Sequence, residues 1–520
     1  MQSNIFGLKN IVSPKMEKEL QASEEQKFYE LIFCNIKEED FACLYSEIDS
    51  RPNVPVNCLV SALILQHRQK LTYEKLFDSI KFNLLTKIAL GLQTLDEIPF
   101  SEASIFNFQN RLNTYFIDNG INLLEKVFDH LTEKQLKELK IKTDIQRTDS
   151  FQAASNIRRY SRLQLLVEML IRIYRVINQE DQKQYEELFS TYVKKTSGQF
   201  IYRLESDAVA SELEKIGMIY KEINGKLKPK YKDVDIFKTF ERVYIEHFTE
   251  VGEKINIKTT EELTSSYLQS PDDIDATYRK KNNKQFYGQA VNIAETCNPD
   301  NPIDLLTDIS VHANNIDDSK ELNKRIDIIK EKTPELNELH TDGAYGSKDN
   351  DVKFDEHAVT PIQTAIRGRE NSGVEITINQ RSEDKYSVSC PNQNVEAEMG
   401  RNRFKAEFDI SICSSCSIAS ECKLQRMKFA KVYYFTEEDY LKKKRLASIQ
   451  KLPKERRSLR TNVEATVSEF TRKMNNRKLK VRGLFKAEIF AFAVGIGVNF
   501  GRIYRYLSAP IPDVALVLQS

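Results

Sequence analysis

The fold of this chain is indicated first by the stretch Lys142-Thr-Asp-Ile-Gln-Arg-Thr-Asp149-Ser150, which is predicted to be a strand with a polar tip. A long helix rich in Arg and Leu is predicted to follow it, over Asn156–Asn178. Further strands are predicted at Gln285–Thr296, Asp304–Val311, Glu338–Asp342 with a Gly-bracketed turn to Gly346, and Ala358–Thr364, with a helix over Asp317–Lys332. Strands interspersed with helices indicate an α/β fold with a mixed sheet and flanking helices.

The composition limits the class of protein. A chain of 520 residues usually forms several domains, and a formal net charge of +1 argues against a protein that simply coats DNA. The opening Met1-Gln-Ser-Asn-Ile5 is unlike a signal peptide. The longest apolar run, Ile489–Phe500, is about half of the ~20 residues that a membrane-spanning helix needs. We therefore expect a soluble intracellular protein with no membrane partner.

The N-terminal region is predicted to consist of short helices, beginning at Val56–Leu65. The last of these, Glu102–Phe116, follows Ser101, which is a good N-cap residue. Its polar residues lie away from its apolar face and are Asn107, Gln109, Asn110 and Arg111. Such side chains match base edges in the major groove, so a helix-turn-helix DNA-binding domain is predicted. The alternative is an ordinary helical bundle with a polar surface.

One carboxylate stands within a strongly basic segment near the C-terminus. Residues 442–482 contain 15 Lys or Arg and three acids, a net charge of 15 − 3 = +12, and one of these acids is Glu464. A basic segment attracts a polyanion, and an acid within it can hold a cation against that polyanion. Asp149 and Asp342 each lie at the end of a predicted strand, so three carboxylates can meet at one sheet edge and hold two Mg²⁺ or Mn²⁺ ions. Spacing alone is weak support, because most of the 76 acids are expected to be solvated surface groups.

Several segments resemble, in the same order, those of bacterial insertion-sequence DDE transposases, whose catalytic core is RNase H-like. The similarity extends from about Val56 to Tyr506 and so covers most of the chain. The matching segments are Arg147-Thr-Asp149-Ser, Asp275-Ala-Thr-Tyr-Arg279-Lys-Lys, Gly288–Cys297, Thr341-Asp342-Gly-Ala-Tyr-Gly346, Asn462-Val-Glu464-Ala-Thr-Val-Ser-Glu469, Lys480-Val-Arg-Gly-Leu484 and Gly495-Ile-Gly-Val-Asn499.

The resemblance implies that Asp149, Asp342 and Glu464 are the catalytic, metal-binding acids, with Asp144 as the alternative first acid. Around the third acid the family carries a Tyr, Arg, Glu, Lys pattern. Arg460 matches its Arg, but Arg457 stands at the Tyr position and Thr471 at the Lys position. The residues expected to contact DNA are Asn107, Asn110, Arg111, Arg279, Lys280, Arg460, Arg472 and Lys473.

The implied reaction is Mg²⁺- or Mn²⁺-dependent hydrolysis at the ends of a mobile DNA element, followed by attack of the freed 3′-hydroxyl on target DNA. The expected partners are double-stranded DNA, as terminal inverted repeats and target, and a second copy of the chain in a homodimer. The expected location is the bacterial or archaeal cytoplasm, in association with the nucleoid. Two alternatives stay open: a catalytically inactive, transposase-derived DNA-binding protein and a zinc-dependent DNA-binding regulator.

Four of the eight cysteines are clustered, at Cys390, Cys413, Cys416 and Cys422, and include one CxxC pair. Four thiolates suit a closed structural Zn²⁺ site, and related transposases carry a similar segment between the second and third acids. An iron–sulfur cluster and unliganded thiols are the alternatives. The other cysteines are expected to be reduced core residues: Cys34, Cys43, Cys58 and Cys297.

These observations predict four regions. Residues 1–135 form a helical DNA-binding domain, and residues 136–369 form the first part of the catalytic core, with a helical insertion at 151–270. Residues 370–435 form the four-cysteine insertion. Residues 436–520 complete the core with basic helices.

Overall fold

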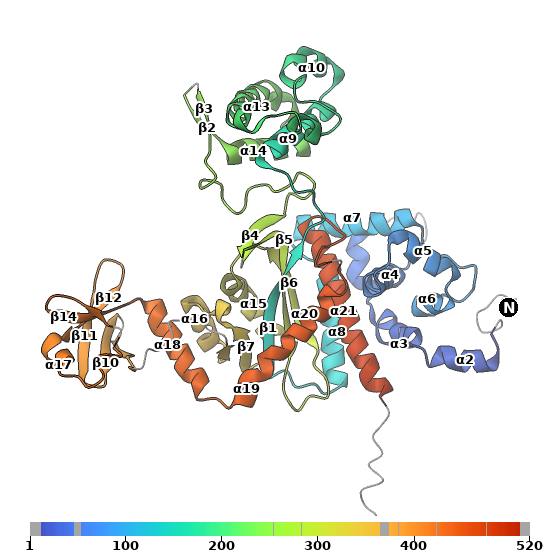
Figure 1. Cartoon of the computed structure of the whole chain (residues 1–520). Helices are drawn as coiled ribbons and strands as arrows, with labels where there is room; N and C mark the ends of the chain where they lie inside the picture. The colour runs from blue at the N-terminus through green and yellow to red at the C-terminus, as the bar shows by residue number, and fades with distance from the viewer. Residues whose placement is uncertain are drawn as a thin grey trace, which may run out of the picture.

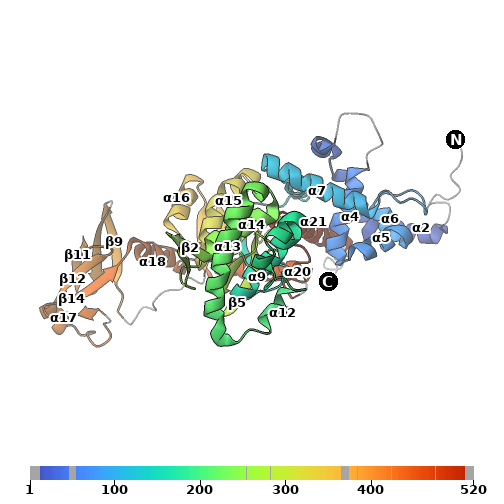
Figure 2. The same ribbon diagram turned by 90° about the horizontal axis from the view of Figure 1, so that it is seen from above.

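The computed structural model describes residues 12–45, 54–252, 254–281, 283–364, 374–382, 384–422, 424–474 and 476–509. A mixed sheet lies at the centre of the molecule, and three lobes surround it (Figure 1). One lobe holds the N-terminal helices, one a helical insertion, and one a small β-rich module joined to the centre by helix α18 (Glu437–Gln450). Figure 2 shows the β-rich module and the N-terminal helices projecting in opposite directions.

The central sheet has the order β4-β5-β1-β7-β8, and β6 also pairs with β5. β5 runs antiparallel to β1, β4 and β6, whereas β7 runs parallel to both β1 and β8. The expected α/β fold with a mixed sheet is therefore confirmed. The strands are β1 (Ile145–Ala154), β4 (Thr277–Lys281), β5 (Lys284–Thr296), β6 (Leu306–Ala313), β7 (Glu338–Asp342) and β8 (Thr360–Thr364).

Helices cover both faces of this sheet. Because successive strand residues point to opposite faces, neighbouring Ile293 and Ala294 belong to different apolar clusters. Ala294 packs with α15 (Asp318–Lys332) and α16 (Lys348–Glu356). Ile293 belongs to the large cluster on the other face, which includes residues of α4 (Val56–Gln69), α8 (Leu123–Glu138), α20 (Val463–Thr471) and α21 (Leu484–Ser508).

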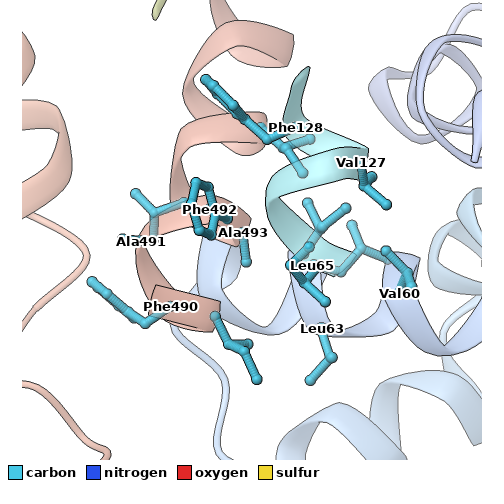
Figure 3. Packing of buried hydrophobic residues seen from close by; sticks show 14 of the residues in the cluster. Val60, Leu63, Leu65, Val127, Phe128, Phe490, Ala491, Phe492 and Ala493 are labelled. Atoms are coloured by element: carbon cyan, nitrogen blue, oxygen red, sulfur yellow. The ribbon is translucent and has the colours of Figure 1, made fainter. Parts of the chain in front are cut away.

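Helix α21 is the centre of the large cluster. Figure 3 shows Phe490 to Ala493 of α21 beside Leu63 and Leu65 of α4 and Phe128 of α8. A Cβ on Gly495 would come within 2.2 Å of Ile309 Cδ1, so a larger residue at this position would force the Ile309 side chain or helix α21 to shift. Asn499 then bonds both backbone groups of Leu306, accepting from its N–H at 2.8 Å and donating to its carbonyl at 3.0 Å. Helix α21 is long and apolar enough to cross a membrane, but it lies mostly buried inside the protein, as core helices do.

The N-terminal helices share this cluster with the sheet. The remaining ones are α2 (Pro14–Gln21), α3 (Glu24–Leu31), η1 (Phe33–Asn35), η2 (Glu38–Leu44), α5 (Tyr73–Phe82), α6 (Leu84–Ala89) and α7 (Glu102–Asn119). Ser101 caps α7 as expected, accepting from the Ser104 N–H at 3.3 Å. The boundary predicted at residue 135 falls within α8, whose apolar face packs against both the N-terminal helices and the core. The boundary predicted at residue 369 lies outside the described residues.

The helical insertion has an apolar core of its own, formed around α9 and α13. The long helix predicted from Asn156 begins only at Arg162, after the N-cap Ser161. The region predicted as a helical insertion, residues 151–270, also contains a short hairpin of two strands, β2 and β3. The elements are α9 (Arg162–Val176), α10 (Gln179–Gln184), α11 (Glu186–Phe189), α12 (Ser197–Ile201), η3 (Ser206–Ala208), α13 (Val209–Tyr231), α14 (Asp235–His247), β2 (Phe248–Val251) and β3 (Lys254–Ile257).

The β-rich module corresponds to the region predicted to form the four-cysteine insertion. Its sheet has the order β13-β14-β12-β11-β10-β9 and its own small apolar core. The elements are β9 (Thr377–Ser382), β10 (Lys385–Cys390), β11 (Gln393–Met399), β12 (Phe404–Asp409), α17 (Ile410–Ser414), β13 (Gln425–Arg426) and β14 (Ala430–Phe435). After α18 the chain returns to the central sheet through α19 (Lys454–Ser458) and η5 (Leu459–Asn462).

Candidate active site

Asp149 and Asp342 lie on neighbouring parallel strands. The pairing of Arg147 with His340 places each acid two residues further along its strand, at the same level of the sheet. Asp342 is the last residue of β7, as predicted. Asp149 does not end its strand, however: β1 continues to Ala154, because five more residues pair with β5. Two carboxylates distant in sequence are thus brought together by strand pairing.

Arg460, in η5, bridges these two acids. Its Nη2 lies 2.8 Å from Asp149 Oδ2 and 3.8 Å from Asp342 Oδ2. The second oxygen of each carboxylate accepts a backbone N–H, from Ser150 at 2.8 Å and from Ala344 at 2.7 Å. One oxygen of each acid is therefore fixed by the backbone, and the other faces a shared cation.

A further carboxylate lies beside Asp149. Asp318, at the start of α15, is buried and accepts a hydrogen bond of 2.7 Å from the Ser150 hydroxyl. Burial raises the pKa of Asp149 and the charge of Arg460 lowers it, while Asp342 and Asp318 contribute to raising it. Sequence reasoning missed Asp318, because an acid in the first turn of a helix is ordinarily explained by the helix dipole.

Glu464 lies in the first turn of α20 and is exposed. Glu464 and Asp149 line the same cavity, whose volume is about 450 Å³. The basic residues Lys281 and Arg477 also line this cavity. Asp342 does not line this cavity. Within the described residues, no three side chains of Asp, Glu, His or Cys lie close enough together to hold a metal ion. The structure thus brings Asp149 to Asp342 and to a cavity shared with Glu464, but it does not gather the three acids into one ligand cluster.

A buried ion network joins α20 to the sheet. Glu295 of β5 is fully buried and accepts hydrogen bonds from Arg147 Nε at 2.7 Å, the Thr466 hydroxyl at 2.8 Å and Arg502 Nη1 at 2.7 Å. Arg147 also donates to the carbonyl of Leu459 at 3.0 Å. The network therefore holds the two residues next to the site, Leu459 before Arg460 and Thr466 after Glu464. The sequence offered no signal for it beyond the nearness of Arg147 to Asp149.

Asp144, the alternative first acid, lies away from this site. It precedes β1, and its carbonyl bonds the start of β7 through Glu338 N–H, whereas Asp342 is at the other end of β7. Its carboxylate accepts from Asn298 Nδ2 at 2.7 Å. Asp149 is thus the better candidate.

The polar residues of α7 are placed only partly as expected. Asn107, Asn110 and Arg111 are exposed, and the Arg111 guanidinium lies 4.9 Å from the centre of the Tyr45 ring. The prediction that Gln109 lies on the surface was wrong. It is buried and donates to the Tyr73 hydroxyl at 2.8 Å, because helix packing leaves its side chain facing α5.

The basic residues expected to contact DNA fall into two groups. Lys280 and Arg472 are exposed. Arg279 instead donates to the carbonyls of Asn314 and Ile316 at 3.1 and 3.0 Å. Lys473 is half-buried and donates to the carbonyl of Arg68 at 2.6 Å, which ties α20 to α4. In this structure, therefore, Lys280 and Arg472 are accessible to a ligand, whereas Arg279 and Lys473 hold the chain's own backbone.

All four clustered cysteines line one small cavity in the β-rich module. Two amide groups point at the sulfurs, with Asn392 Nδ2 3.0 Å from Cys416 Sγ and Gln393 Nε2 3.3 Å from Cys413 Sγ. All eight cysteines are free, and Cys58 and Cys297 are buried as expected. Cys34 and Cys43 are exposed, so the prediction that they are core residues was wrong; their short helices present them to solvent.

Comparisons with known families agree with this arrangement. Residues 382–504, which include Arg460 and Glu464, match the family model described as Transposase DDE domain. Residues 17–111 match the model described as Transposase domain (DUF772). No curated protein and no solved structure matches the chain. Two transposase models matched in chain order, together with paired acids on parallel strands, identify the chain as a member of the insertion-sequence DDE transposases.

Proposed function

We propose that this chain cleaves DNA at the ends of a mobile element and transfers the freed 3′-hydroxyl ends to target DNA, with Asp149, Asp342 and Glu464 as the catalytic acids. The proposal is carried by Asp149 and Asp342 sharing the guanidinium of Arg460, in a chain that matches a DDE domain. The sheet order β6-β5-β1-β7-β8, with β5 antiparallel to its neighbours, supports an RNase H-like core. Asp149 on the central strand is then the first acid.

The donor atoms fit Mg²⁺ or Mn²⁺. Carboxylate oxygens are the hard ligands that these ions prefer. The Oδ2 atoms of Asp149 and Asp342, which are not bonded to the backbone, already face one cationic group, the guanidinium of Arg460. When bound, a divalent ion would supply charge stabilisation and a more acidic water or hydroxyl at the scissile phosphate. Glu464 is exposed and lines the cavity together with Asp149, so a rotation of its side chain is not hindered by burial.

The chain's own contribution is positioning and charge. The backbone N–H groups of Ser150 and Ala344 fix the two aspartates, and the Glu295 network holds α20. Lys281 and Arg477 line the cavity, so a phosphodiester entering it meets two cations. Holding the reacting groups in line in this way is a large part of what an enzyme contributes to phosphoryl transfer.

Three further assignments belong to the same proposal. Asn107, Asn110 and Arg111 read the element ends from α7, in a helix-turn-helix-like domain. Cys390, Cys413, Cys416 and Cys422 would hold a structural Zn²⁺ only after their side chains move closer together, because no three of these four described residues lie within metal-binding distance in this structure. Their common cavity and the amide donors at two sulfurs support this assignment. The active assembly is a homodimer, because two element ends must be handled together, and it acts in the cytoplasm on nucleoid DNA.

The test is the substitution Asp342→Asn, which keeps the shape of the side chain and removes its charge. Cleavage and strand transfer of DNA carrying the inverted repeats that flank the gene should be abolished, while binding of the same DNA should stay nearly unchanged. Glu335→Gln, at an exposed acid before β7, is the matched control and should leave both unchanged. Equal cleavage by Asp342→Asn and the wild type would instead favour a DNA-binding protein without this chemistry.

A further inference from the structure

The β-rich module ends in an exposed hairpin at the edge of its sheet. β13 pairs with β14 through Gln425 to Val432 and Arg426 to Lys431. The Met427 N–H donates to the Ala430 carbonyl at 2.8 Å and closes the turn. β13 is the terminal strand in the sheet order, so this tip projects from an edge. We refer to Gln425–Phe429 as the hairpin tip.

The hairpin tip presents large apolar side chains to solvent. All five of its residues are exposed, and the exposed fraction is 78% for Phe429 and 45% for Met427. Single exposed apolar residues are common, but an aromatic ring and a methionine two residues apart at a projecting turn are typical of an interaction site. Neither side chain contributes to the module's apolar core.

Cations alternate with these apolar residues. Arg426 and Lys428 flank Met427, and the Lys428 Nζ lies 5.1 Å from the centre of the Phe429 ring. From residue 424 to residue 435 the sequence contains no Asp or Glu. The acid that faces this end of β14 is Asp409, opposite Ala430, and it accepts from the Ser411 N–H at 2.7 Å. The hairpin tip is therefore locally positive, and the apolar side chain of Met427 lies between its two cationic residues in the sequence.

We propose that the hairpin tip binds DNA, with Arg426 and Lys428 at phosphates and the Phe429 ring inserted against a base. Proteins that deform DNA use apolar side chains in this way, and nearby cations hold the backbone. Base stacking on an aromatic ring tolerates any sequence, because every base has a π-face. The inference rests on the proposed function only in taking DNA as the substrate.

The position of the module favours a DNA contact distant from the acids. Figures 1 and 2 both show the module extended from the centre of the molecule on helix α18, and Figure 1 shows it away from β1 and β7. Helix α18 adds Lys442 and Lys444 between the module and the core, whereas Lys443 donates to the carbonyl of Ile376 at 2.7 Å. The first turn of α18 is acidic, so a duplex lying along this arm would meet these two lysines near the core and the cations of the hairpin tip at its end.

The experiment measures binding of the full chain to a fluorescein-labelled duplex of random sequence, by anisotropy at several salt concentrations. Phe429→Ala should weaken binding about tenfold. Arg426→Gln combined with Lys428→Gln should lower the slope of log K against log salt by about two. Met399→Ala is the matched control, because Met399 is 64% exposed at the β11–β12 hairpin of the same sheet, whose turn carries Arg401 and Arg403 but no exposed aromatic ring. It should bind as the wild type does.

Three results would overturn the inference. Phe429→Ala could bind with unchanged affinity, or Met399→Ala could lose as much affinity as Phe429→Ala. Phe429→Ala could also reduce self-association in sedimentation while binding DNA normally, which would identify the tip as a protein interface. Circular dichroism melting should show that every variant is folded. A wild-type chain that does not bind duplex DNA would refute the proposed function itself, whereas normal binding by both wild type and Phe429→Ala refutes only the hairpin.

Discussion

Replacing Glu295 with Gln should test whether the buried network positions the acid of α20. Glu295 is fully buried and bonded to two guanidinium groups, of which that of Arg147 is also almost fully buried. Removing one partner of a buried ion pair typically costs about 3–5 kcal/mol, because the remaining charge is left without compensation. Gln keeps the shape and one acceptor oxygen, so we expect a loss of about 3 kcal/mol in the free energy of unfolding.

The same substitution should lower catalysis beyond its effect on stability. The network holds Leu459 and Thr466, which lie beside Arg460 and Glu464. A displacement of about 1 Å at a reacting group can reduce the rate about 100-fold. We therefore expect cleavage by Glu295→Gln to fall about 100-fold, with a higher Mg²⁺ concentration needed for half-maximal activity, while DNA affinity changes little.

Asp308→Asn provides the matched control. Asp308 lies on β6, which pairs with β5, and it is equally buried and also bonded to two cations, Arg325 and Lys332. Its network joins β6 to α15 and does not contact α20. Both variants should show a similar loss of stability in urea unfolding. Cleavage should be measured at a temperature where both are folded. If Asp308→Asn loses as much activity and Mg²⁺ response as Glu295→Gln, the reasoning is refuted.

Two further predictions concern pH and metal. Burial raises the pKa of Glu488 to about 7, so the folded state binds more protons than the unfolded state between about pH 4.5 and 7. The stability of the wild type should therefore fall as pH rises through this window. Glu488→Gln still offers an oxygen to Asn122, and it should flatten the pH dependence of the melting temperature and raise the melting temperature at pH 8. An unchanged pH profile would contradict this prediction. Elemental analysis of purified Cys413→Ser should show no bound zinc, and the β-rich module should be less stable in this variant. Cys58→Ser, whose residue lies outside that cavity, should retain the metal. Equal zinc contents in the two variants would contradict the proposed four-cysteine zinc site.

The local elements followed closely from the sequence. The helix starting after Ser101 and the strands near Gln285 and Glu338 were predicted within a few residues, because capping groups and apolar periodicity act over one or two turns. The errors have local causes too. β4 was not among the predicted strands, since Thr277–Lys281 is polar and becomes a strand only by pairing with β5. Gln109 was predicted to be exposed, because residue type alone does not reveal a buried partner such as Tyr73.

The sequence by itself determined which acids are candidates, with Asp342 at a strand end and Glu464 within a strongly basic segment. Only the tertiary structure decided that Asp149 and Asp342 share Arg460, that Asp318 adds a further charge, and that Glu295 holds α20 to the sheet. The physical reason is that strand pairing and helix docking join residues separated by hundreds of positions. The spacing of these residues in the sequence therefore does not indicate that they are in contact.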